Sequence, residues 1–181
     1  MKTHIDISKR KGERKEFSEA SLVRIKELMS NVPEGKHKTA VIHVLHMAQS
    51  ELGGWISVET MDYVAELLNI TPIEVYEVAT FYTMFHLDPT GKYVLEVCRT
   101  GPCMLVGSDK IIDYIEKKLA IKVGETTSDG LFTLKTVECL GACGYGPMLQ
   151  CQYKNYEFLT TEKVDDLLNA MRNGILETYQ S

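Results

Sequence analysis

Two pairs of cysteines constrain this chain more than any other feature of its sequence. Cys98 and Cys103 form a C-x4-C pair, Cys139 and Cys143 form a C-x3-C pair, and residues 104–138 separate them. A short apolar run that predicts a β-strand precedes each pair, over 93–97 and 131–138. Each pair therefore follows a strand end, where two loops can close on one site. Four thiolates that converge in this way can hold a metal centre or a cluster.

The ligand type leaves more than one metal open. Thiolates select zinc, copper(I) or iron–sulfur clusters, and both spacings fit structural zinc. The cysteines, however, follow strands of a domain that has its own core and little need of a metal for folding. The loops also hold small residues that let backbone amides approach the sulfurs, which favours iron–sulfur. These are Gly101, Gly107, Gly141, Ala142, Gly144 and Gly146. Two cysteine pairs match a two-iron cluster, one pair per iron, with a zinc-stapled structural module as the alternative.

Composition and charge exclude several classes of function. The net charge of −5 provides no basic face for nucleic acid. No apolar run approaches the roughly 18 residues that a membrane span needs, and no secretory signal is visible. Paired cysteines without an export signal favour a reducing compartment, so we expect a cytoplasmic protein. Cys151 lies on a predicted strand outside the pairs, where a buried core thiol is expected.

The pattern along the chain predicts an α+β protein in three parts. Residues 1–16 are polar and basic and predict a flexible arm. Residues 17–88 carry four helical segments with short connections, which predict a small helical bundle. A capping-box sequence, Thr71-Pro72-Ile73-Glu74, begins the fourth helix. Residues 89–181 alternate strands and helices in the order β-α-β-β-β-α, which predicts a small mixed sheet with helices packed on it.

The cysteine motifs, with others in order along the chain, resemble a known family. The carrying stretches are Val97-Cys98-x4-Cys103 and Val137-Glu138-Cys139-Leu140-Gly141-Ala142-Cys143. Supporting motifs are Gly54-Trp55-Ile56, Val78-Ala79-Thr80-Phe81-Tyr82, Pro89-Thr90-Gly91-Lys92-Tyr93 and Gly124-Glu125-Thr126-Thr127. Over about residues 17–173 the chain resembles the thioredoxin-like 2Fe–2S ferredoxin subunit of bacterial NADH:quinone oxidoreductase, respiratory complex I. Related chains occur in NAD-dependent hydrogenases and formate dehydrogenases.

This resemblance implies a fold, a cofactor and partners. It implies a thioredoxin-like α/β ferredoxin domain over 89–181 and one 2Fe–2S cluster on Cys98, Cys103, Cys139 and Cys143. The cluster would exchange one electron with the FMN of a flavoprotein partner subunit that binds NADH and FMN. Further partners are the iron–sulfur subunit of the same complex and, only through the complex, the cytoplasmic face of the inner membrane. An equivalent subunit of a hydrogenase or formate dehydrogenase is the alternative.

The chain itself offers no complete active site. No Ser-His-Asp or Cys-His arrangement can be placed, and no glycine-rich phosphate loop follows a strand. We therefore expect no catalytic residue here, and NADH and FMN only in the partner subunit.

Overall fold

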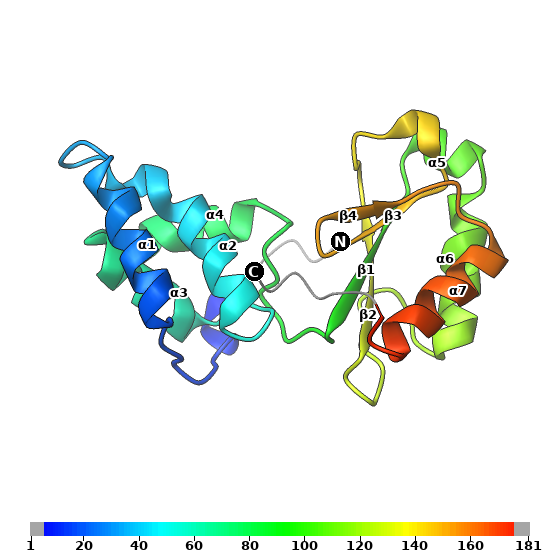
Figure 1. Cartoon of the computed structure of the whole chain (residues 1–181), viewed down its shortest axis with the longest axis horizontal. Helices are drawn as coiled ribbons and strands as arrows, with labels where there is room; N and C mark the ends of the chain where they lie inside the picture. Colours follow the sequence, from blue (N-terminus) through cyan, green and yellow to red (C-terminus); the bar gives the residue numbers. More distant parts are fainter. Residues whose placement is uncertain (1–5, 176–181) are drawn as a thin grey trace. The chain divides into compact units, whose positions relative to one another are not determined.

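A computed structural model describes residues 6–175, and these form two compact units that divide between Pro89 and Thr90 (Figure 1). The first unit contains only helices among its described elements, and the second contains a sheet with helices. The elements of the first unit are η1 Ile7–Lys9, α1 Glu19–Ser30, η2 His37–Ala40, α2 Val41–Glu51, α3 Val58–Leu68 and α4 Pro72–Phe81. Those of the second are β1 Tyr93–Cys98, α5 Gly101–Leu105, α6 Ser108–Leu119, β2 Phe132–Val137, η3 Cys143–Tyr145, β3 Leu149–Cys151, β4 Lys154–Tyr156 and α7 Thr161–Arg172.

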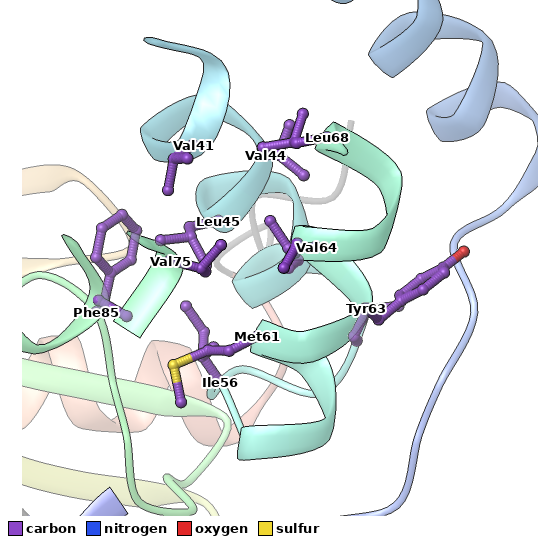
Figure 2. Close-up of a cluster of buried hydrophobic side chains, with 14 of the residues drawn as sticks. Val41, Val44, Leu45, Ile56, Met61, Tyr63, Val64, Leu68, Val75 and Phe85 are labelled. Atoms are coloured by element: carbon purple, nitrogen blue, oxygen red, sulfur yellow. The ribbon is translucent and has the colours of Figure 1, made fainter. Parts of the chain in front are cut away.

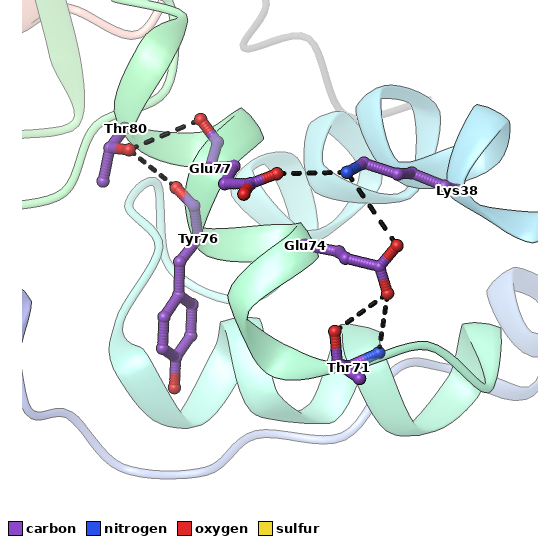
Figure 3. A network of polar contacts seen from close by, with 6 residues as sticks. All are labelled: Lys38, Thr71, Glu74, Tyr76, Glu77 and Thr80. Carbon is purple, nitrogen blue, oxygen red and sulfur yellow. Dashed lines mark hydrogen bonds and ion pairs between the residues drawn. The ribbon is translucent and has the colours of Figure 1, made fainter.

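Local side-chain caps decide where the helices of the first unit begin. The Ser18 side chain accepts a hydrogen bond from the first turn of α1, and Ser57 does the same for α3. At the start of α4 the Glu74 carboxylate accepts hydrogen bonds from the Thr71 backbone N–H, at 3.0 Å, and from its hydroxyl, at 2.9 Å (Figure 3). Lys38 also reaches Glu74, which connects η2 to α4. The capping-box prediction is therefore confirmed.

The core of the first unit is a set of aliphatic side chains from α2, α3 and α4 (Figure 2). Val44, Leu45, Val64 and Val75 are fully shielded from solvent, each with 0% of its surface exposed. Apolar residues that recur three and four positions apart on a helix lie on one face, and here that face points inward. Burial of this face supplies the main stabilisation of a bundle whose helices are too short to persist alone.

The segment before α1 lies against α3. The Gly12 N–H donates a hydrogen bond of 2.6 Å to the Glu59 carboxylate, and Arg14 forms an ion pair of 2.9 Å with Glu66. The sequence predicts a flexible arm over 1–16, of which residues 1–5 lie outside the described residues. The contacts of Gly12 and Arg14 hold the rest of this segment to the helical unit, so any freedom there requires these contacts to open.

The second unit is a four-stranded mixed sheet in the order β2-β1-β3-β4. β1 and β2 are parallel, and β3 is antiparallel to both β1 and β4. The helices α6 and α7 pack together on one face of the sheet, where Leu95, Ile115, Leu134 and Leu168 form part of the core (Figure 1). Parallel neighbours need a crossover connection, and α6 supplies it.

The described residues confirm the predicted α+β class, with a helical unit followed by a mixed sheet that carries helices. One local expectation, that the cysteines lie in loops, is wrong at two positions: Cys103 lies in the short helix α5, and Cys143 begins the 3-10 helix η3. The bounds 17–88 and 89–181 as independently folding domains remain a prediction. In the part of the chain that the structure describes, no helix is long and apolar enough to cross a membrane.

Candidate metal centre

The register of the parallel strands brings both cysteine pairs to one edge of the sheet. Cys98, the last residue of β1, lies opposite Val137, the last residue of β2, and Cys139 follows two residues later. Because parallel strands end at the same edge, the two cysteine segments leave the sheet side by side. The turn into β3 returns to this edge, where the Cys98 N–H donates to the Met148 carbonyl at 3.1 Å. Strand pairing therefore assembles the site from segments 40 residues apart.

The two pairs differ in their exposure to solvent. Cys98 and Cys103 are buried together with Met148, and Leu140 and Ala142 of the second segment pack against them. Cys139 and Cys143 are exposed. The first pair therefore lies in an apolar environment, and the second pair faces solvent.

Backbone amides point at two of the sulfurs, and one of these amides belongs to a small residue that the sequence singles out. The Gly141 N–H donates a hydrogen bond to Cys139 Sγ at 3.3 Å. Gly141 has a φ of +72°, a conformation that side-chain-bearing residues rarely adopt, so glycine permits this turn. The backbone amides of Thr100 and Leu140 act on Cys98 in the same sense.

The pKa values of the two buried thiols, Cys98 and Cys103, are shifted in opposite directions. Burial acts to raise the pKa of Cys98, but hydrogen bonds from Thr100, Cys103 and the Leu140 backbone amide together outweigh it, and the net pKa is lowered. Burial raises the pKa of Cys103 to about 11, helped by its hydrogen bond to Cys98 and by the charges of Cys98, Cys143 and Cys139. The charges of the other three thiols therefore all act on Cys103.

Two contacts at this site were not predicted from the sequence, one by Thr100 and one by Gly146, which the sequence marks only as a small residue of the loop. A Cβ atom added to Gly146 would lie 3.3 Å from Cys103 Sγ and 2.9 Å from Val106 Cγ2, so the backbone closes tightly on this sulfur. The Thr100 hydroxyl contacts the Glu138 carbonyl of the second cysteine segment and lies 3.5 Å from Cys98 Sγ. A threonine two residues after a cysteine and a glycine before a proline are too common to predict such contacts.

The donor set fits a 2Fe–2S cluster by its chemistry. It consists of thiols alone, arranged as two pairs at one sheet edge, with amide donors directed at the sulfurs. Within residues 6–175, no three His, Cys, Asp or Glu side chains are gathered tightly enough to hold a metal ion. The structure thus brings Cys98 and Cys103 together and places Cys139 and Cys143 beside them without closing the set. The assignment of all four as ligands stays a proposal.

Cys151 lies apart from these thiols, on β3 in the core of the sheet unit. Burial, with the charge of Glu96, raises the pKa of its thiol to about 12. A buried thiol of high pKa is inert, as expected for a core cysteine.

The mixed sheet with two helices on one face, and the paired cysteines at its edge, agree with the thioredoxin-like ferredoxin that the sequence motifs resemble. A profile of the thioredoxin-like 2Fe–2S ferredoxin family matches residues 25–172, and the chain belongs to this family. A 2Fe–2S cluster is the cofactor that this family implies.

Several relatives match most of the chain. The chain is 49% identical over 149 residues to a subunit of the NADH-quinone oxidoreductase of Rickettsia prowazekii, a match that covers 82% of this chain and 84% of the relative. It is 43% identical over 157 residues to the protein of the same name from Rickettsia conorii, covering 87% and 94%. It is also 43% identical over 159 residues to NADH dehydrogenase (ubiquinone) flavoprotein 2, mitochondrial, of Dictyostelium discoideum, covering 88% and 64%.

A solved structure shares the fold. A chain of an NAD+-reducing NiFe-hydrogenase in the H2-reduced state superposes with a TM-score of 0.67 at 18% identity. The match covers 78% of this chain but only 24% of the hydrogenase chain, so the present chain corresponds to about a quarter of it.

Proposed function

We propose that this chain is the electron-transfer subunit of an NADH:quinone oxidoreductase and holds one 2Fe–2S cluster on Cys98, Cys103, Cys139 and Cys143. The observation that carries the proposal is the parallel register of β1 and β2, which delivers both cysteine pairs to one sheet edge. Relatives at 43–49% identity are named as subunits of NADH-quinone oxidoreductase or of NADH dehydrogenase, which supports a parent complex of this type. Those relatives favour a quinone-linked complex over a hydrogenase, since the hydrogenase likeness is one of fold.

A 2Fe–2S cluster supplies one-electron chemistry when it is bound. The residues of this chain have three tasks towards it. The four thiolates would hold it, and the amide of Gly141, which donates to Cys139 Sγ, would stabilise a ligand sulfur. Met148 and the buried pair Cys98 and Cys103 exclude water from one side. The exposed pair leaves the other side open to a partner.

The exposed apolar surface beside the cysteines supports the proposal that a partner protein binds there. Met104, Leu105 and Val106, which follow Cys103 directly, are exposed, and Leu105 presents 89% of its surface to solvent. A run of exposed apolar residues is unfavourable in water and indicates a protein interface. The partner we propose is the flavoprotein that binds NADH and FMN, with the iron–sulfur subunit of the same complex nearby. We place this assembly at the cytoplasmic face of the inner membrane.

Metal analysis and EPR spectroscopy test the cluster. The full chain is purified without oxygen, assayed for iron, sulfide and zinc, and measured by EPR after reduction. We expect about two irons and two sulfides per chain and an S = 1/2 signal from the reduced cluster. Cys139→Ala should lose both, whereas Cys151→Ala is the control and should keep them. Zinc without iron, even after anaerobic reconstitution, would instead establish a zinc-stapled structural module.

Co-purification tests the partner surface. Leu105→Lys should lose co-elution with the flavoprotein subunit while its iron content stays at the wild-type level. Val123→Lys changes an exposed apolar residue of the same unit that follows α6 and should co-elute normally. Normal co-elution of both variants would remove α5 from the proposed interface.

A further inference from the structure

Thr100 connects the two cysteine segments through its hydroxyl group. This hydroxyl donates a hydrogen bond to the backbone carbonyl of Glu138, the residue directly before Cys139. The same oxygen lies 3.5 Å from the sulfur of Cys98. One half-buried side chain therefore contacts the end of β1 and the segment that follows β2, 38 residues further along the chain.

Which group donates a hydrogen bond in these contacts depends on whether Cys98 is a thiol or a thiolate. A carbonyl oxygen can only accept, so in the thiol form the single Thr100 proton lies on the bond to Glu138. The Cys98 S–H group then serves as donor, with the Thr100 oxygen at 3.5 Å and the Glu138 oxygen at 3.9 Å. A cysteine that binds iron is a thiolate, which has lost that proton and can only accept. The Thr100 hydroxyl is then the donor shared by the carbonyl and the sulfur.

We propose that Thr100 is a positioning residue for the cluster: its hydroxyl holds the second cysteine segment against the first and donates to the Cys98 thiolate, which raises the reduction potential. This inference rests on the proposed function, because it requires a cluster on Cys98. A hydrogen bond to a ligand sulfur withdraws electron density and stabilises the reduced cluster, which carries one more negative charge.

Through its hydrogen bond to Glu138, Thr100 should also affect how readily the cluster assembles. Cys139 and Cys143 are exposed, and the contact of Thr100 with Glu138 lies immediately before them. Without it, the exposed pair has more conformational freedom to lose when iron binds. Loss of the hydroxyl should therefore slow incorporation of iron as well as lower the potential.

The test compares three variants of the full chain, each reconstituted anaerobically with ferrous iron and sulfide. Thr100→Val removes the hydroxyl at nearly constant volume, and Thr100→Ser keeps it. Thr126→Val is the matched control, because the Thr126 hydroxyl contacts Thr133 at the other end of β2, away from the cysteines. The midpoint potential is measured by redox titration followed by EPR, alongside iron content and thermal unfolding.

We expect Thr100→Val to shift the reduction equilibrium about tenfold towards the oxidised cluster, or about 59 mV for one electron. Thr100→Ser should restore most of this shift, and Thr126→Val should show the wild-type potential. If Thr100→Val fails to fold, Thr100→Ala makes the same comparison with Thr100→Ser. A purely structural role would change iron content without changing the potential of the molecules that hold a cluster.

The outcomes separate this inference from the proposed function. A wild-type chain that holds no 2Fe–2S cluster overturns both. A wild-type cluster whose potential is unchanged in Thr100→Val overturns the role of Thr100 and leaves the four ligands in place. A lowered potential that Thr100→Ser does not restore assigns the effect to side-chain shape and also overturns the hydroxyl's role.

Discussion

At the scale of single residues, Gly146 carries the tightest steric demand at the cysteine site. A Cβ atom there would lie 2.9 Å from Val106 Cγ2 and 3.3 Å from Cys103 Sγ, so the Val106 side chain, the sulfur or the loop must shift. We expect Gly146→Ala to reduce iron incorporation several-fold, because Cys103 is displaced from its place beside Cys98. Iron content and the visible spectrum after anaerobic reconstitution measure this.

Gly144 provides a matched control for Gly146 in the same loop. A Cβ atom at Gly144 meets no other atom within 4 Å, and its φ does not lie in the left-handed range. Gly144→Ala should therefore incorporate iron like the wild-type chain. Equal iron contents in the two variants would show that close packing on Cys103 is not required.

Sequence alone predicts the residue types of the site but not their distances. The two cysteine pairs and the small residues between them are visible as spacing and composition. The contact of Gly146 with Cys103 depends on how the loop after β2 folds back over α5, which no local pattern encodes. The role of Thr100 escapes prediction for the same reason, since its partner Glu138 is 38 residues away.

At the scale of elements, β1 contains one carboxyl group, that of Glu96, whose charged form is disfavoured by burial. Glu96 lies opposite Lys135 of β2 and Gln150 of β3. Burial raises the pKa of Glu96, although the charge of Lys135 acts in the opposite direction. In the unfolded chain this carboxyl titrates at about 4.3. As the pH rises above that value, the unfolded state loses the proton first, so stability falls until the folded state has lost it too.

Glu96→Gln should therefore stabilise the protein at neutral pH and change little at a pH below about 4, where the carboxyl is protonated in both states. We expect the midpoint of urea unfolding to rise at neutral pH, whereas in acid both chains should unfold at similar urea concentrations. Glu34→Gln, which removes an exposed carboxylate, is the control and should show no such pH dependence. A lower stability of Glu96→Gln at neutral pH would mean that attraction to Lys135 exceeds the cost of burial.

Elements with local signals are well predicted, and those without them are not. Thr71 precedes a helix that begins where the predicted capping box indicates, and Ser18 and Ser57 are cap residues of the same kind before α1 and α3. Helix α5 escaped prediction because Gly101–Leu105 is too short for an amphipathic period and includes both Gly101 and Pro102. The apolar runs predict the strands. No local pattern predicts the order β2-β1-β3-β4, because it depends on pairing between residues far apart in the sequence.

At the scale of the whole molecule, the described residues form two large apolar cores and one small cluster at the cysteines. The core of the sheet unit comes mainly from β1, β2, α6 and α7 and includes none of the four proposed ligands. The small cluster holds only Cys98, Cys103 and Met148 as buried members. The hydrophobic effect therefore stabilises both units without any contribution from a metal.

Removal of the cluster should for this reason leave both units folded. A chain stripped of iron by a chelator under reducing conditions should keep its far-UV circular dichroism and unfold cooperatively, with stability lowered by on the order of 3 kcal/mol through loss of the bound group. Zinc fingers behave in the opposite way, because their metal is needed for folding. Cys139→Ala provides the control, since it lacks the cluster without chelator and should unfold like the stripped chain. Loss of cooperative unfolding in both would show that the cysteine site holds the sheet unit together and does more than carry electrons.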